Sequence, residues 1–188
     1  MEPDWSDITY LLAGNERQKN AYDVLESLAL LRQLSAFTPL LAGTVPLDID
    51  VPGSDLDIVC EVRDFDAFER LVRSLYGHLD GFACVRRTVD GIPRVKINFT
   101  AGEWPIELFG QPVPVTGQNG FRHMVVEHRL LQEHGEALKS AVRVLKTGGV
   151  KTEPAFARAL GLTGDPYLTL LALYADNETN DPTRRNAE

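Results

Sequence analysis

The chain has 188 residues, of which 44% are hydrophobic and 24% are charged, and its formal net charge is −8. This composition is typical of a globular protein with a normal core, and the negative charge argues against non-specific binding to nucleic acid, which depends on basic surfaces. No apolar run is long enough to span a membrane, and the acidic stretch 1–7 does not resemble a secretory signal. We therefore expect a cytoplasmic protein that does not insert into membranes.

The first half of the chain alternates between helical and extended patterns. Apolar residues recur at helical spacing over residues 16–35, which predicts one amphipathic helix. A second helix is predicted after Asp64, whose side chain suits the N-cap position. Extended apolar patterns predict five strands, at residues 38–43, 54–62, 82–89, 93–99 and 104–109.

A hairpin signal and then a change to helical periodicity follow the third predicted strand. The Asp90-Gly91 pair is typical of a tight hairpin, so antiparallel pairing enters the sheet. From Asn119 onward the pattern is helical, and Asp165-Pro166 begins a last helix. We expect an α/β (α+β) fold, with a substrate cleft between its two parts. Its predicted portions are a mixed sheet with flanking helices in residues 1–115, a helical portion in 116–175 and a disordered tail in 176–188.

Paired carboxylates stand at the start of the second predicted strand. Asp55 and Asp57 are separated by one residue, so they point to the same side of an extended strand. Two like charges held together are costly unless a cation joins them, and a ligand set made only of oxygens suits Mg²⁺ or Mn²⁺. Glu107, flanked by apolar residues in a later strand, is the best candidate for a third ligand.

These acids also fit roles that involve no metal. The stretch 48–57 is consistent with an acidic loop that stays solvated, and Glu107 with a solvated strand position. A calcium loop is excluded, because Pro52 stands where an oxygen ligand belongs. Asp48 and Asp50 precede a turn signal and are left out of the predicted metal site.

A small flexible turn precedes the two aspartates. Gly43-Thr44 follows an apolar strand and is separated from Asp55 by ten residues. A residue without a side chain lets backbone N–H groups approach phosphate oxygens, and the threonine hydroxyl adds a donor. The turn and the acids together predict a site for a metal-bound triphosphate.

The Gly-Thr turn and the later Asp-x-Asp pair resemble the signature of the polymerase β-type nucleotidyltransferase superfamily. Four stretches further resemble the bacterial family DUF4269, a domain of unknown function: residues 41–46, 52–58, 106–111 and 151–157. The resemblance implies a palm-like mixed sheet and a nucleoside triphosphate as donor. It also implies phosphate contacts from Gly43 and Thr44 and a metal pair held by Asp55, Asp57 and Glu107. The chain departs from the pattern in having Thr where Ser is commoner and in lacking a strongly basic surface for large RNA acceptors.

Further polar residues are candidates for binding the nucleotide or its phosphates. Ser54 precedes the first aspartate, and Lys96 lies on a polar strand face that either lines the cleft or faces solvent. Lys146 and Lys151 bracket a Gly-Gly turn, either as a triphosphate clamp or as a helix connection whose cations offset the helix dipole.

His123 opens the helical portion, where it can reach a nucleotide. With Glu127, four residues later, it forms either a metal-binding pair on one helix face or an ordinary surface histidine whose hydrogen bonds are satisfied. The spacing alone does not decide between these interpretations. We include His123 in the nucleotide-binding set.

The leading hypothesis is a Mg²⁺- or Mn²⁺-dependent enzyme that transfers a nucleoside monophosphate to a hydroxyl and releases pyrophosphate. Asp55 and Asp57 hold two metal ions, Glu107 completes one site and serves as base, and the Gly-Thr turn positions the β- and γ-phosphates. The acceptor is open: a small molecule, a protein side chain or a tRNA end. The alternatives are a non-catalytic nucleotide- or partner-binding protein on the same fold and a metal-dependent nucleotide hydrolase.

Overall fold

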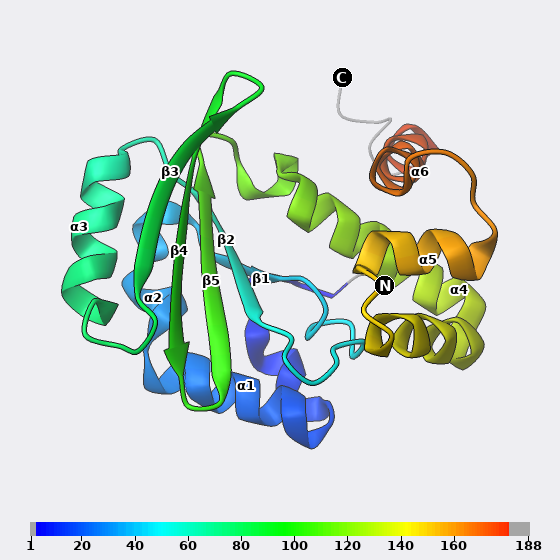
Figure 1. Ribbon diagram of the computed structural model, residues 1–188, viewed down its shortest axis with the longest axis horizontal. Helices are drawn as coiled ribbons and strands as arrows, with labels where there is room; N and C mark the ends of the chain where they lie inside the picture. Colours follow the sequence, from blue (N-terminus) through cyan, green and yellow to red (C-terminus); the bar gives the residue numbers. More distant parts are fainter. Residues whose placement is uncertain (1–2, 181–188) are drawn as a thin grey trace. The chain divides into compact units, whose positions relative to one another are not determined.

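Five strands form a mixed sheet in the first part of the chain. The structure, a computed structural model, describes residues 3–180 and divides into two compact units that join between Gln118 and Asn119 (Figure 1). In the first unit the strands follow the order β1-β2-β5-β4-β3, with β2 parallel to β5 and the other neighbours antiparallel. Their bounds are Leu40–Ala42 (β1), Leu56–Glu61 (β2), Ala83–Val89 (β3), Ile92–Ala101 (β4) and Trp104–Gln111 (β5). The predicted fold class and its five strands are confirmed.

Helices cover one face of this sheet. They are α1 (Glu16–Ser27), α2 (Leu30–Gln33) and α3 (Phe65–Tyr76), with short 3₁₀ helices η1 (Ile8–Ala13) and η2 (Ser35–Phe37). Ile58, Leu108 and Ile97 lie opposite one another on β2, β5 and β4 and are fully buried in one core with helix side chains. Burying each such side chain stabilises the fold by ~1.5–3 kcal/mol. Because side chains alternate along a strand, Asp57 and Glu107 lie on the opposite face, which we call the site face.

Two short sequence signals are confirmed by local geometry. Asp64 caps α3, because its side chain accepts a hydrogen bond from a backbone N–H in the first turn (2.9 Å). In the hairpin, Val89 pairs with Ile92, and the two residues between them, Asp90 and Gly91, have φ of 52° and 76°. Positive φ at both central positions is typical of the two-residue turn that an Asp-Gly pair favours.

The prediction of one helix over residues 16–35 is wrong. The helix is interrupted at Ala29, which has φ of 49°, and α2 begins directly after it. The carbonyl of Leu28 accepts a hydrogen bond from the hydroxyl of Tyr76 (3.1 Å), and Leu30 is fully buried. Contacts with the rest of the core therefore override a helical pattern that is continuous in the sequence.

The second unit consists of helices. They are α4 (Asn119–Thr147), α5 (Thr152–Leu160) and α6 (Pro166–Asn180); η3 (Val115–Gly117) precedes them in the first unit. α4 is kinked at Gly135, and Asp165 caps α6 as predicted, accepting a hydrogen bond from the N–H of Tyr167 (2.9 Å). α6 continues past Asp176, where we predicted the tail to begin, and the tail residues 181–188 lie outside the described residues. Within residues 3–180, no helix combines the length and the apolar character that crossing a membrane requires.

Candidate active site

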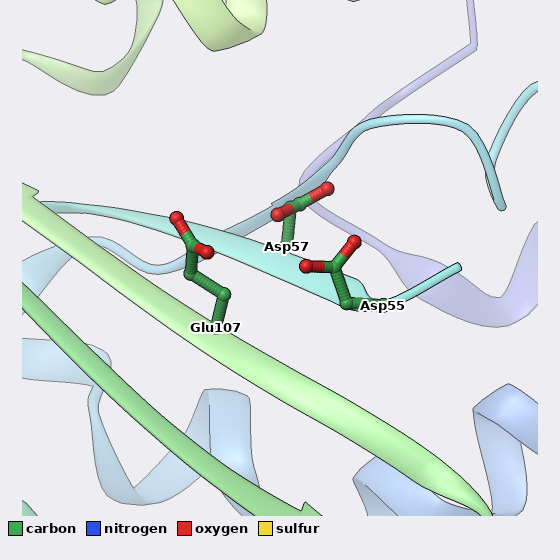
Figure 2. A group of neighbouring side chains, drawn as sticks. All are labelled: Asp55, Asp57 and Glu107. Atoms are coloured by element: carbon green, nitrogen blue, oxygen red, sulfur yellow. The ribbon is translucent and has the colours of Figure 1, made fainter. Parts of the chain in front are cut away.

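Three acidic side chains converge on the site face of the sheet. β2 runs parallel to β5 with Asp57 directly opposite Glu107. Asp55 lies two residues earlier, just before β2. One ligand oxygen from each of the three carboxylates lies within 4.8 Å of the other two (Figure 2). We call this group the triad.

A lysine lies against the third acid. Nζ of Lys96 forms an ion pair with Oε2 of Glu107. Both belong to the site face, because Asn98, two residues after Lys96, lies directly opposite Glu107. The Lys96 side chain is 51% exposed and the Glu107 side chain 18%. The ammonium supplies part of the positive charge that closely spaced carboxylates require, so this position already accepts a cation.

Gly43 lies beside the second acid. β1 pairs antiparallel with β2, with Ala42 opposite Asp57. Gly43 follows with φ of 79°, and a Cβ at this position would collide with Oδ2 of Asp57. Only glycine combines this backbone conformation with so close an approach to the carboxylate. The backbone of the Gly-Thr turn therefore lies directly against the triad.

The loop that joins this turn to the aspartates is tied to α1. The side chain of Asp50 is 3% exposed and forms an ion pair with Nε of Arg17. Nδ2 of Asn15, the N-cap of α1, donates a hydrogen bond to Asp48 (2.5 Å). These two acids thus hold the loop in place, which agrees with their exclusion from the predicted metal site.

Two other predicted phosphate-binding residues lie at the ends of the same loop. Thr44 directly follows Gly43, and Ser54 directly precedes Asp55. The hydroxyl oxygen of Ser54 accepts a hydrogen bond from the N–H of Val51 (3.0 Å), so this side chain also closes a turn. Their contact with phosphate stays a prediction.

Three predicted nucleotide-binding residues lie in the second unit. Nζ of Lys146 donates a hydrogen bond to Oγ1 of Thr152 (2.7 Å), within the connection between α4 and α5. Lys151 is exposed at the N-cap of α5. His123 is buried, with 7% exposure, so the interpretation as a surface histidine is wrong. A role of these three residues in nucleotide binding stays a prediction.

His123 belongs to a buried acid–base cluster of which the sequence indicated only the His123–Glu127 pair and not Glu153. Its Nε2 donates to the carbonyl of Tyr167 (3.1 Å), and its Nδ1 donates to the Glu153 carboxylate (3.2 Å). Burial acts to lower the pKa of His123, but these hydrogen bonds and the nearby carboxylates of Glu153 and Glu127 together raise the pKa. Two hydrogen bonds to groups that only accept require a proton on each ring nitrogen, so the imidazole is charged.

Two carboxyls of the cluster have pKa values that are shifted in opposite directions. Burial raises the pKa of Glu127 to about 8. Burial acts in the same sense on Glu153, but the hydrogen bonds to its carboxylate and the positive charges of His123 and Lys146 together lower the pKa of Glu153. Glu153 lies thirty positions from His123, and an acid in the first turn of a helix is too common to signal such a pairing.

The triad is the metal-ligand candidate among the described side chains. It is the one group of three or more His, Cys, Asp or Glu residues in that part of the chain whose ligand atoms lie close enough to share an ion. The predicted alternative of a metal held by His123 and Glu127 is therefore unsupported. Three carboxylates form a hard oxygen donor set that fits Mg²⁺ or Mn²⁺.

The sequence matches a known family. The family model described as "Domain of unknown function (DUF4269)" matches residues 23–173, which include the triad. None of the curated proteins matches the chain.

Solved structures share its fold. The polymerase core of TRAMP, an RNA surveillance complex, superimposes with a TM-score of 0.51 at 14% identity, over 93% of this chain and 63% of that chain. A mutant of the Cid1 poly(U) polymerase bound to MgATP superimposes with a TM-score of 0.52 at 15% identity, over 74% of this chain and 46% of that chain. The GLD-2/RNP-8 complex superimposes with a TM-score of 0.51 at 15% identity, over 92% of this chain and 68% of that chain. The chain thus spans less than two thirds of the length of the TRAMP polymerase core and of the Cid1 polymerase. The predicted polymerase β-type nucleotidyltransferase fold is confirmed.

Proposed function

The chain belongs to the DUF4269 family, and from that premise we propose that it is a metal-dependent nucleotidyltransferase. It transfers a nucleoside monophosphate from a nucleoside triphosphate to a hydroxyl acceptor and releases pyrophosphate. The observation that carries this proposal is the convergence of Asp55, Asp57 and Glu107 within 4.8 Å on a sheet with the nucleotidyltransferase fold. The predicted cytoplasmic location is part of the same proposal.

The carboxylates of the triad hold Mg²⁺ or Mn²⁺ in this proposal. Bound divalent ions neutralise charge on the transferring phosphoryl group and on the attacking and leaving oxygens. The ion pair between Lys96 and Glu107 supports the assignment, because the triad attracts positive charge there. Glu107, the member of the triad on β5, is also assigned as the base that accepts the proton of the acceptor hydroxyl.

The phosphates of the donor are assigned to the Gly-Thr turn. The backbone at Gly43 passes directly beside Asp57, and Thr44 adds a hydroxyl donor. Ser54 and Lys96, at the edges of the triad, complete the set in the first unit.

The test is pyrophosphate release by the Asp57→Asn variant. Incubation of the full chain with Mg²⁺, each of the four labelled triphosphates and a cell extract identifies the donor and the acceptor together. Asp57→Asn should abolish pyrophosphate release and leave the melting temperature within a few degrees of wild type. Asp90→Asn, an exposed substitution at the hairpin tip, is the matched control and should keep full activity.

The released products decide between the candidate functions. Unchanged pyrophosphate release by Asp57→Asn would refute the catalytic assignment. Release of orthophosphate in place of pyrophosphate would make the protein a nucleotide hydrolase. Triphosphate binding that is indifferent to Mg²⁺ and yields no product would make it a binding protein.

A further inference from the structure

Two arginines face each other on the hairpin of β3 and β4. Arg87 lies directly opposite Arg94 in the antiparallel register, so both side chains belong to one face of the sheet. Lys96 is two residues further along β4, which makes this face the site face. Like charges directly opposite each other destabilise a sheet. The arginine pair is therefore unfavourable unless an anion lies between the two guanidinium groups.

Neither guanidinium of the arginine pair forms an ion pair with an acid among the described residues. Nε of Arg94 is hidden from solvent and has no hydrogen-bond partner within that part of the chain. Arg86, the neighbour of Arg87 on the other face, pairs with both Asp66 and Glu69 of α3. On the helix-covered face of this hairpin, Arg86 is thus paired with acids. On the site face, Arg87 and Arg94 form no ion pair with any described acid.

The arginine pair and the Gly-Thr turn lie on opposite flanks of the triad. In the strand order β1-β2-β5-β4-β3, the turn follows β1, the triad belongs to β2 and β5, and the arginines belong to β4 and β3. Arg94 lies four residues along β4 from Asn98, the residue opposite Glu107, which corresponds to roughly 13 Å. Val85 of β3 lies opposite Lys96, between the positions of Arg94 and Asn98. It is 45% exposed and offers an apolar contact to a bound molecule.

We infer that Arg87 and Arg94 bind a phosphate group of the acceptor. This inference rests on the proposed function. In transfer at phosphorus the attacking and leaving oxygens lie roughly in line, so a donor triphosphate at Gly43 puts the acceptor on the flank of β4 and β3. Two guanidinium forks match the oxygens of one phosphate. The acceptor is a phosphorylated molecule long enough to reach from the triad to the arginine pair, whose backbone lies roughly 13 Å along β4 from Asn98. An unmodified protein side chain is excluded because it carries no phosphate.

The test is binding of a probe that differs only in its phosphate. The probe is 5′-phosphorylated diadenylate, compared with diadenylate that lacks the 5′-phosphate, and calorimetry is carried out in EDTA so that no metal is involved. The full chain should bind the phosphorylated probe at least about tenfold more tightly than the other. Arg87→Gln should lose this difference. Arg70→Gln, which removes an exposed arginine on α3, is the matched control and should keep it.

Thermal unfolding separates a loss of phosphate binding from a loss of folding in the variants. Arg87→Gln should melt at the same or a higher temperature than wild type, because it removes a like-charge contact. Inorganic phosphate should raise the melting temperature of wild type and of Arg70→Gln but not of Arg87→Gln. Equal binding of the two probes by wild type, or equal binding of the phosphorylated probe by Arg87→Gln and Arg70→Gln, would overturn the inference.

The two proposals fail in different ways. Asp57→Asn should bind the phosphorylated probe as wild type does, because the arginine pair does not include the triad. If that variant keeps pyrophosphate release, the proposed function fails while the phosphate site stands. If Arg87→Gln binds the probe unchanged while Asp57→Asn is inactive, only the acceptor inference fails.

Discussion

Gly43 illustrates how a single position links backbone conformation to the proposed chemistry. Its φ of 79° is left-handed, and an added Cβ would meet the carboxylate of Asp57. Gly53 has a similar φ of 88° but has no described atom near the place where its Cβ would be. Both glycines therefore need a positive φ, but only Gly43 also needs to lack a Cβ in order to lie against Asp57.

Alanine at each of these glycines separates the two effects. Both Gly43→Ala and Gly53→Ala should lose ~1–2 kcal/mol of unfolding free energy, because alanine is strained at positive φ. Gly43→Ala should also displace Asp57 and abolish pyrophosphate release, whereas Gly53→Ala should keep it. Denaturant unfolding and an activity assay on both variants check this. Full activity in Gly43→Ala would show that the close approach to Asp57 has no role in catalysis.

The triad could be predicted from sequence because each acid carries a local signal. Asp55 and Asp57 share strand parity, and Glu107 is a lone acid among apolar residues of a strand. The buried cluster around His123 carries no such signal, because Glu153 comes from another helix. The arginine pair was likewise not singled out, since its register depends on where the hairpin turns and on which face of β3 the helices cover.

α1 does more than cover the sheet, since its N-terminal end holds the loop between the Gly-Thr turn and the triad. Arg17 reaches Asp50, whose side chain is 3% exposed, and Arg17 also lies over the Trp104 ring, 4.0 Å from its centroid. A buried carboxylate that loses its cation is strongly destabilising. The ion pair is therefore more important for the fold than an ordinary surface pair.

Arg17→Met should lower the unfolding free energy by ~2–3 kcal/mol, because it leaves the Asp50 carboxylate buried and unpaired. Adding Asp50→Asn to this variant should recover part of the loss. Lys19→Met breaks an exposed pair with Glu16 on the same helix and should cost less than ~0.5 kcal/mol. Chemical denaturation of the three variants measures these differences. A double variant less stable than Arg17→Met alone would contradict the account of the loop.

Element types were predictable where local chemistry agrees with tertiary packing. Asp64 at an N-cap and Asp90-Gly91 at a hairpin tip each adopt the conformation that their residue types favour. The break at Ala29 was not predictable, because alanine favours a continuous helix. The left-handed conformation there is imposed by contacts of Leu28 and Leu30 with the core.

The protein as a whole should lose stability as the pH rises from about 5 to about 8.5. Glu127 has a pKa of about 8 in the fold, compared with an ordinary value of 4.5. Between these values the folded protein keeps a proton that the unfolded chain releases, so the unfolding free energy falls as the pH increases. The raised pKa of His123 acts in the same direction, because its stabilising charge is lost as the pH rises through the folded pKa.

Glu127→Gln should therefore reduce the pH dependence of stability. The melting temperature of wild type should fall between about pH 5 and about pH 8.5, and the fall should be smaller in Glu127→Gln. Glu133→Gln, at an exposed position of the same helix, should behave as wild type. Calorimetric melting across this pH range checks the prediction. Parallel curves for wild type and Glu127→Gln would show that Glu127 titrates normally in the fold.

The location of bound Mn²⁺ tests the central claim most directly. Crystals of the full chain soaked with Mn²⁺ and a non-hydrolysable triphosphate give anomalous diffraction, which locates the metal independently of activity. We expect manganese between Asp55, Asp57 and Glu107, with the triphosphate beside Gly43. Manganese bound only at other acids, with Lys96 still paired to Glu107 and the triad free of metal, would contradict the account.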